Sequence, residues 1–418
     1  MITKKKQLNN LHRVLGLGDA VAVGIGAIIG AGIFVVSGTT ASIAGPAMLV
    51  SLLIAGLAAS FNGLSSAQLA SKFPRAGGTY EYGYEMIHPL AGFSAGWMFL
   101  ISKLSGGGVV ALGFGSYLQK LFPALDVRWT ATFTLLVLVL ANIAGINKAG
   151  VLNRIIVTIT VLSLLYFILS GLFTFDITHL RPFAPMGFEG IAEASGVVFF
   201  AFTGYARIAT LGGEVIDPKI TISRAIIITL ISSVFLYILV SFVALGAIGA
   251  EGMAASETPL FLAAETMVFP GITSIIMLSG TTALLGVLLS QILGTSRMFF
   301  AMGKRGDLPS FFSKVTIKSR VPIYGILLSG FIILLTIWIG ELTFITQTAA
   351  FTILIYYSIT NLSALQLPRK DRFLPSWIAW AGLLMCILLA FNLPLPSVLA
   401  GVYLLLIGHI IRFIFAFF

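Results

Sequence analysis

Four glycines crowd the middle of an otherwise apolar segment. The segment reads Gly24-Ile25-Gly26-Ala27-Ile28-Ile29-Gly30-Ala31-Gly32-Ile33-Phe34. Because glycine adopts non-helical backbone angles at little cost, an interruption near Gly30 to Gly32 would free backbone amides to face a ligand. Close packing against a neighbouring helix is the alternative explanation of the same glycines. A dinucleotide-binding fingerprint does not fit, because the glycine spacing is wrong and no predicted strand precedes it.

A second apolar segment carries glycine and threonine among aromatic residues near its centre. It reads Ser195-Gly196-Val197-Val198-Phe199-Phe200-Ala201-Phe202-Thr203-Gly204-Tyr205-Ala206-Arg207. The N-terminal end of a half-helix presents free amides and a partial positive charge, which suit a carboxylate, whereas free carbonyls at a C-terminal end suit an ammonium group. Two antiparallel interrupted helices side by side would offer both ends. An α-amino acid zwitterion is the natural ligand for such a site.

A lysine, Lys103, stands at the midpoint of a third apolar segment. A charge at that depth costs at least about 2.5–3.5 kcal/mol on insertion scales, so the residue is a functional candidate. Because burial disfavours the charged form of an amine, Lys103 could exchange protons near neutral pH. Two alternatives are a fixed positive charge that replaces a bound cation, and a side chain that extends to water along a cavity.

Residue types that enzyme or metal chemistry would need are scattered along the chain. No glycine-rich phosphate loop ending in Lys-Ser or Lys-Thr occurs, which argues against an ATP-driven pump. The single cysteine, Cys386, excludes a disulfide within the chain. We therefore expect no enzymatic activity, no metal and no cofactor. The histidines lie at the ends of apolar segments without metal-ligand spacing, at His12, His88, His179 and His409.

The elements that must position these residues are membrane helices. Of 418 residues, 58% are hydrophobic and only 10% are charged, so most of the chain must have lipid as its solvent. The apolar stretches are too long for barrel strands, which predicts an all-α membrane protein with about twelve transmembrane helices. The expected spans are residues 18–44, 47–70, 89–121, 130–145, 151–173, 189–211, 225–248, 267–302, 322–339, 342–365, 377–391 and 398–415.

The basic residues predict an orientation for these spans. Twenty of the 25 lysines and arginines fall in segments that share one side with the N-terminus, three fall on the other side, and two lie within spans. Such a bias predicts a multi-pass protein of the cell inner membrane with both termini in the cytoplasm. It also removes nucleic acid as a partner, because the net charge of +10 follows the insertion pattern. The basic start precedes a full span, which indicates a retained first helix and not a signal peptide.

The two glycine-containing spans occupy corresponding places in the chain. Each opens a set of five spans, and because five is odd, the second set must be inverted relative to the first. Paired interrupted helices in such a repeat point to a transporter binding site. We expect a tail at residues 1–16, a first repeat at 17–174, an inverted second repeat at 189–366 and two additional helices at 374–418.

Several motifs occur along the first eight spans in the order found in one transporter superfamily. They are Gly26 to Phe34, Ala44 to Ala47, Phe73 to Tyr80, Phe199 to Tyr205, Glu214 to Pro218, Ser296-Arg297, Ala301-Met302 and Leu308-Pro309. Together they resemble the motifs of the amino acid–polyamine–organocation (APC) superfamily. The resemblance implies a LeuT-type five-plus-five inverted repeat with two extra helices, and an amino acid held at the two interruptions.

The resemblance also implies roles for individual residues. The substrate carboxylate would meet the amides of Ala31 and Gly32, and its ammonium group would meet the carbonyls of Ile28, Phe200 and Thr203. Phe200 would stand in the place of an aromatic gate. The substrate-binding residues expected on this basis are Ile28, Gly30, Ala31, Gly32, Phe200, Phe202, Thr203 and Gly204.

The chain departs from parts of the superfamily at two positions that bear on coupling. Some relatives carry a lysine in the fifth helix in place of a sodium ion, where this chain has Thr160, and another subgroup has an acid where this chain has Ala206. A threonine hydroxyl could help to bind sodium, although it more often bonds its own helix. Lys103 and Thr160 are therefore the candidates for coupling to an ion.

The acidic residues indicate the substrate class. None of the 15 aspartates and glutamates lies at mid-depth of an expected span, so a cationic side chain would find no carboxylate. We expect a secondary active transporter of neutral amino acids that works by alternating access and proton symport. An exchanger and a non-transporting nutrient receptor of the same fold are the alternatives, and the missing signalling domain counts against the receptor. A channel is disfavoured because the sequence shows no ring of repeated filter residues.

Overall fold

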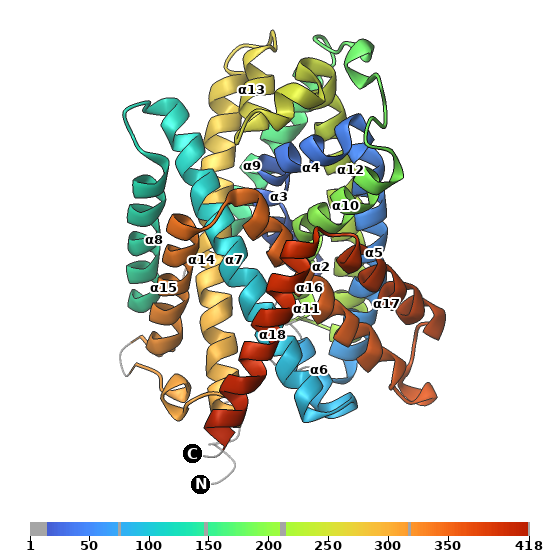
Figure 1. The fold of residues 1–418 in the computed structure, drawn as a ribbon, viewed down its shortest axis with the longest axis vertical. Coiled ribbons are helices and arrows are strands. Elements are labelled where there is room, and N and C mark those ends of the chain that lie inside the picture. The colour runs from blue at the N-terminus through green and yellow to red at the C-terminus, as the bar shows by residue number, and fades with distance from the viewer. Residues whose placement is uncertain (1–14, 74–76, 146–148, 210–214, 317–318, 417–418) are drawn as a thin grey trace.

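A computed structural model describes residues 15–73, 77–145, 149–209, 215–316 and 319–416, which form helices joined by short turns and a single isolated β-bridge between Leu15 and Val215 (Figure 1). The first half contains α2 (Leu17–Ile28), α3 (Ala31–Phe34), α4 (Val36–Ala44), η1 (Gly45–Ala47), α5 (Met48–Lys72), α6 (Thr79–Met86), α7 (Pro89–Leu121), α8 (Val127–Ala144), α9 (Ala149–Gly171) and η2 (Ile177–Leu180). The second half contains α10 (Gly187–Phe199), η3 (Phe200–Tyr205), α11 (Ala206–Ala209), α12 (Pro218–Ala254), α13 (Pro259–Glu265), α14 (Ile272–Arg305), η5 (Ser310–Ser313), α15 (Ile323–Ile339), α16 (Leu342–Leu365), η6 (Arg369–Asp371), α17 (Ser376–Phe391) and α18 (Leu395–Ala416).

The described helices have the lengths and surfaces that a bilayer requires. Within the described ranges, nine helical stretches are long and apolar enough to cross a membrane, and α15 and α17 are shorter apolar helices. On α8, the side chains of Trp129, Phe133 and Leu140 are 65%, 69% and 65% exposed. Apolar side chains that would be costly in water are stable when they face lipid. The chain is therefore a multi-pass membrane protein.

The first interruption separates α2 from α3. The prediction of a break near Gly30 to Gly32 is close, but the non-helical residues are Ile29 and Gly30, and Gly32 already belongs to α3. A side chain at residue 30 would collide with α14, because an added Cβ would lie 2.6 Å from Val287 Cγ2. The Tyr237 hydroxyl donates to the carbonyl of Ile28 at 2.8 Å, which gives a partner to a buried carbonyl at the C-terminal end of α2.

The second interruption is tighter than the first. The chain between α10 and α11 continues as the 3-10 helix η3 and does not become extended. Gly204 lies directly against α2, since an added Cβ there would be 2.2 Å from the Ala27 carbonyl oxygen. The 3-10 segment of the second interrupted helix is thus in contact with the last turn of α2, directly before the first interruption.

The remaining boundaries follow local chemistry. The helix α7 has the bounds predicted for the long third span. The predicted eighth span begins five residues too early, because Pro270 and Gly271, which has φ 74°, precede the first turn of α14. The predicted motif residues Pro74 to Ala76 and Glu214, and most of the predicted tail, lie outside the described residues.

The turn before α6 is anchored to α16. Gly77 and Gly78 have φ values of 130° and 54°, which favour glycine. The Thr79 amide then donates to the hydroxyl of Tyr356 at 3.3 Å, and the hydroxyls of Thr79 and Thr360 lie 2.6 Å apart. This motif therefore forms an ordered connection between elements far apart in the sequence.

Candidate functional site

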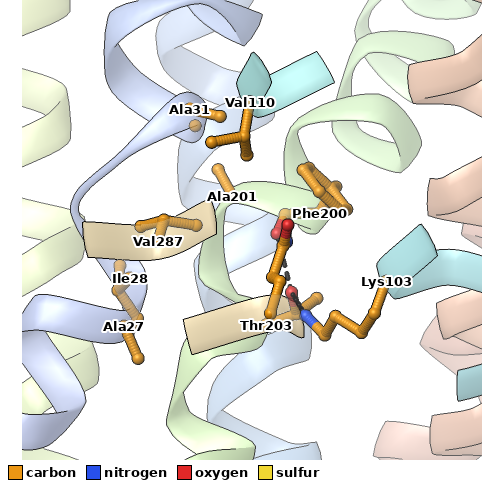
Figure 2. A pocket seen from close by; sticks show the side chains of 11 residues that line it. Ala27, Ile28, Ala31, Lys103, Val110, Phe200, Ala201, Thr203 and Val287 are labelled. Atoms are coloured by element: carbon orange, nitrogen blue, oxygen red, sulfur yellow. Dashed lines mark hydrogen bonds between the residues drawn. The ribbon is translucent and has the colours of Figure 1, made fainter. Parts of the chain in front are cut away.

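A small cavity lies where the two interruptions meet, enclosed by α2, α3, η3, α7 and α14 (Figure 2). Backbone of the two interrupted helices forms one wall, and the side chains of α7 and α14 close the others. The residues that line it are Ala27, Ile28, Ala31, Gly32, Lys103, Val110, Phe200, Ala201, Thr203, Val287 and Gln291.

Five of the eight residues predicted to bind substrate line this cavity, and three do not. The five are Ile28, Ala31, Gly32, Phe200 and Thr203. The other three lie behind the lining and pack against neighbouring elements. Gly30 leaves room for Val287, and Gly204 contacts the backbone of α2. The ring of Phe202 packs on that of Tyr237, with the ring centroids 5.3 Å apart. Phe202 therefore lies beside the gate position in sequence but faces away from the cavity.

Lys103 reaches into the cavity from the middle of α7 (Figure 2). Its Nζ donates to Thr203 Oγ1 at 3.0 Å and lies 5.7 Å from the ring centroid of Phe200. A cation over an aromatic face is attracted by the ring quadrupole. Lys103 takes part in none of the ion pairs found among the described residues.

The carbonyls predicted to accept the substrate ammonium group already accept hydrogen bonds. Thr203 Oγ1 donates to the carbonyl of Phe200 at 2.9 Å, and the Tyr357 hydroxyl donates to the carbonyl of Thr203 at 3.3 Å. The carbonyl of Ile28 accepts from Tyr237. Each carbonyl oxygen has two lone pairs, so a second donor can still bind.

Sequence reasoning missed the contribution of α14. Val287 and Gln291 line the cavity, and Gln291 Oε1 is buried with no hydrogen-bond donor of the described residues in reach. A lone carboxamide in an apolar run is the signal that could have identified Gln291. Ala27 and Ala201 lie within the quoted motifs but were not predicted to bind substrate, and Val110 lies in no motif.

Thr160 lies outside the cavity lining. Its hydroxyl donates to the carbonyl of Ile156 on its own helix at 2.8 Å, and the residue is 2% exposed. Across the described residues, no three His, Cys, Asp or Glu side chains are grouped to hold a metal ion. Among the residues that line the cavity, the one ionisable side chain is therefore that of Lys103.

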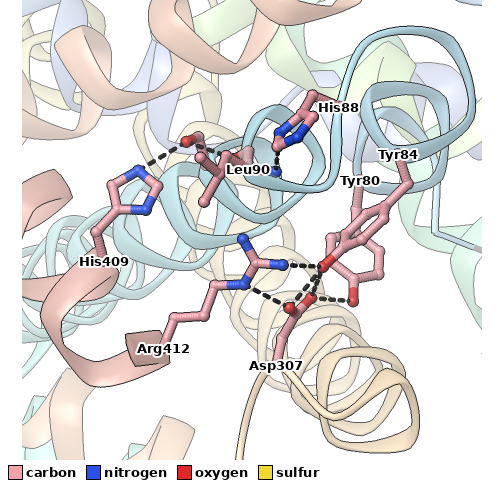
Figure 3. A network of polar contacts seen from close by, with 8 residues as sticks. Tyr80, Tyr84, His88, Leu90, Asp307, His409 and Arg412 are labelled. Atoms are coloured by element: carbon pink, nitrogen blue, oxygen red, sulfur yellow. Dashed lines mark hydrogen bonds and ion pairs between the residues drawn. The ribbon is translucent and has the colours of Figure 1, made fainter. Parts of the chain in front are cut away.

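A second polar cluster joins α6, α18 and the turn after α14 (Figure 3). Asp307, whose side chain is 5% exposed, accepts hydrogen bonds from Tyr80 and Tyr84 and pairs with Arg412, with Nε and Oδ1 2.8 Å apart. Burial first, and then the Asp307 carboxylate, raises the pKa of Tyr80 and of Tyr84, so both phenols remain donors. We call these four residues the Asp307 cluster.

Comparisons with known proteins cover almost the whole chain. The profile of the family described as amino acid permease matches residues 15–416. An uncharacterized transporter of Mycobacterium tuberculosis is 35% identical over 402 residues, which cover 96% of this chain and 90% of that protein. The branched-chain amino acid permease of Bacillus subtilis is 29% identical over 97% of this chain and 94% of its own length. The mitochondrial cationic amino acid transporter 3 of Arabidopsis thaliana is 30% identical over 77% of this chain and 56% of its own length.

Proposed function

Because this chain belongs to the amino acid permease family, we propose that it is a secondary active transporter that moves neutral amino acids across the cytoplasmic membrane by alternating access, coupled to protons. The observation that carries the proposal is the cavity at the contact of two interrupted helices. Helix ends at such a place offer backbone amides to a carboxylate and backbone carbonyls to an ammonium group. No enzyme chemistry is needed to explain this arrangement.

The architecture that goes with this function is a LeuT-type fold. We propose about twelve spans, with α15, α17 and the interrupted α10–η3–α11 segment added to the nine long stretches. The first five would form one repeat over residues 17–174, the next five an inverted repeat over 189–366, and the last two would be additional helices at 374–418. The basic residues support an inner-membrane location with both termini in the cytoplasm.

The pose of the substrate follows from the lining. The carboxylate would meet the amides of Ala31 and Gly32 at the start of α3, where the first amides of a helix have no partner within it. The ammonium group would meet the carbonyls of Phe200 and Thr203, and the ring of Phe200 would act as the gate. The side chain would then face Val287 and Gln291 on α14.

The charges around the cavity support neutral substrates. No aspartate or glutamate is among the lining residues, and Lys103 is a cation within the lining. A lysine or arginine substrate would bring a further positive charge without a carboxylate partner, which is unfavourable in a low-dielectric site. This favours the neutral class of the branched-chain relative over the cationic class of the Arabidopsis relative. Lys103 is also the proposed proton carrier, since it is the one titratable side chain among the lining residues.

The test is uptake of a labelled amino-acid panel into proteoliposomes with and without a pH gradient. We expect leucine, alanine or serine to accumulate and to outcompete arginine and lysine. Accumulation that depends only on amino acid inside the vesicles would instead identify an exchanger. Tight binding without any uptake would identify a receptor, and clear preference for arginine or lysine would reject the neutral class.

A further inference from the structure

The cationic end of the binding site is already occupied by a side chain of the protein. Lys103 Nζ donates to Thr203 Oγ1, and Thr203 Oγ1 in turn donates to the carbonyl of Phe200, at 3.0 and 2.9 Å. The carbonyl of Phe200 is one of the acceptors proposed for the substrate ammonium group. The Lys103 ammonium is thus only two hydrogen bonds away from the place where a second ammonium would have to bind.

In the described part of the chain, no carboxylate lines the cavity and none forms an ion pair with Lys103, so none is placed to hold two cations together. The carboxylate of Glu193 lies on α10, the helix that precedes η3, and its Oε1 accepts from Gln347 Nε2 at 3.2 Å. The carboxylate of Glu257 accepts a hydrogen bond from Ser116 Oγ on α7 through its Oε2. The tyrosine hydroxyls nearby are neutral donors to backbone, and so cannot compensate a charge. The other titratable and charged groups within about two helical turns of a lining residue, or packed on the lining, are Tyr117, Tyr205, Arg207, Tyr237, Arg297, Tyr356 and Tyr357.

We propose that Lys103 and the substrate ammonium group share a single cationic position, so that amino-acid binding displaces one proton from Lys103. The inference rests on the proposed function. In the step, one N–H bond of the Lys103 ammonium breaks and its proton passes to water on the open side of the transporter. The electron pair that remains on Nζ accepts a hydrogen bond from the substrate ammonium. The cationic position then holds one positive charge before and after binding, which avoids two adjacent buried cations, while the substrate carboxylate binds at the amides of α3.

The displacement fixes the sign of the coupling. Binding free energies are reciprocal, so if the substrate expels the proton, protonation of Lys103 must weaken substrate binding by the same factor. A carrier that crosses the membrane with either a proton or an amino acid moves the two in opposite directions. The geometry thus favours proton–amino acid antiport, opposite to the symport that the sequence suggested.

The experiment measures protons and substrate together on the purified protein. Leucine or alanine is added at a saturating concentration to weakly buffered protein, and a pH dye reports the protons released. Calorimetry in two buffers of different ionisation enthalpy then gives the number of protons released per bound amino acid. We expect release of about one proton per bound amino acid at about pH 6.5, and less as rising pH removes that proton from Lys103 before binding. Proton uptake, or binding without release, would overturn the proposal.

An analogue pair tests the role of the substrate ammonium without any mutation. The α-hydroxy acid analogue of leucine keeps the carboxylate and the side chain but has no ammonium group. We expect it to release no proton, because Lys103 can remain charged and donate to its hydroxyl. Equal release by leucine and by its hydroxy analogue would contradict a shared cationic position.

Variants identify Lys103 as the source of the proton. Lys103→Met should bind leucine without proton release and with an affinity that no longer depends on pH. Lys103→Arg, whose guanidinium stays charged, should bind at least about ten-fold more weakly than the parent. Lys120→Met is the matched control, because Lys120 lies in the last turn of the same helix and its replacement should leave both measurements unchanged.

If no amino acid binds at all, the proposed function fails together with this inference, whereas binding with unchanged proton release in Lys103→Met rejects the inference alone.

Discussion

Gly32 lies where α3 packs directly against η3. A Cβ added there would lie 2.4 Å from the Cβ and 2.7 Å from the Cα of Ala201, distances that real Cβ atoms do not show. We therefore expect Gly32→Ala to abolish transport, and to lower the thermal unfolding temperature, because the backbones of the interrupted helices must separate. Uptake in proteoliposomes and unfolding followed by size-exclusion fluorescence measure the two effects.

The partner of Gly32 provides the control. In Gly32→Ala combined with Ala201→Gly, one methyl group is added and its obstacle is removed, so part of both losses should be recovered. If Gly32→Ala alone retains transport and stability, the close approach of the two helices is not needed. If the double variant is no better than the single one, the glycine acts through its backbone amide and not through packing.

The lining residues show what a single sequence can and cannot specify. Ile28, Ala31, Gly32, Phe200 and Thr203 could be predicted because each interruption is local, and its glycines and motif lie within a few residues. The residues from α14 could not, because that helix is apolar on most of its faces and its pattern does not show which side meets the interruptions. The same limit explains Phe202, which an η3 turn directs toward Tyr237.

Among the elements, α6 and α18 are joined to the end of α14 by the Asp307 cluster. The Asp307 and Arg412 side chains are only 5% and 19% exposed, so removal of one charge leaves the other poorly solvated. We expect Asp307→Asn to lower the free energy of unfolding by about 3–5 kcal/mol. Denaturation in detergent monitored by intrinsic fluorescence is the measurement.

An exposed ion pair of the same type serves as the comparison. Lys72 and Asp371 are each 31% exposed, so Lys72→Met should cost no more than about 1 kcal/mol. Adding Arg412→Leu to Asp307→Asn should cost less than the two single changes together, because no unpaired charge remains. Equal losses for Asp307→Asn and Lys72→Met would mean that the cluster is not a buried pair in the membrane-bound protein.

Helix positions were more predictable than helix interruptions. The span of α7 could be read from its apolar run and the flanking Pro89. The 3-10 geometry of η3 could not, because it depends on the contact of Gly204 with the backbone of α2, which lies far away in sequence. Local propensity sets where a helix forms, and tertiary contact decides how an interrupted one continues.

At the scale of the whole molecule, the charged side chains divide between two ends. In Figure 1, α6 and the C-terminal end of α18 lie at the bottom and α13 lies at the top. The exposed Lys304 lies in the last turn of α14, beside Arg305, which pairs with Glu81 of α6. The exposed Lys370 lies in η6, beside Asp371, which pairs with Lys72 at the end of α5. Lys120 lies in the last turn of α7, at the end of that helix farthest from α6. If basic residues face the cytoplasm, the α6 end is the inner end.

The orientation can be tested with single cysteines, because the native Cys386 is buried and in contact with Asn62 Nδ2 at 3.1 Å. An impermeant maleimide should therefore not label the parent protein in intact membranes. In right-side-out vesicles we expect label on Lys120→Cys and Arg181→Cys, but none on Lys304→Cys and Lys370→Cys. Inside-out vesicles should give the reverse, because each exposed site then faces the other compartment.

Labelling of Lys304→Cys and Lys120→Cys from the same side would contradict a membrane between the two ends. A complete reversal would keep the membrane but place the α6 end outside, and the excess of basic residues there would then have to reflect something other than insertion.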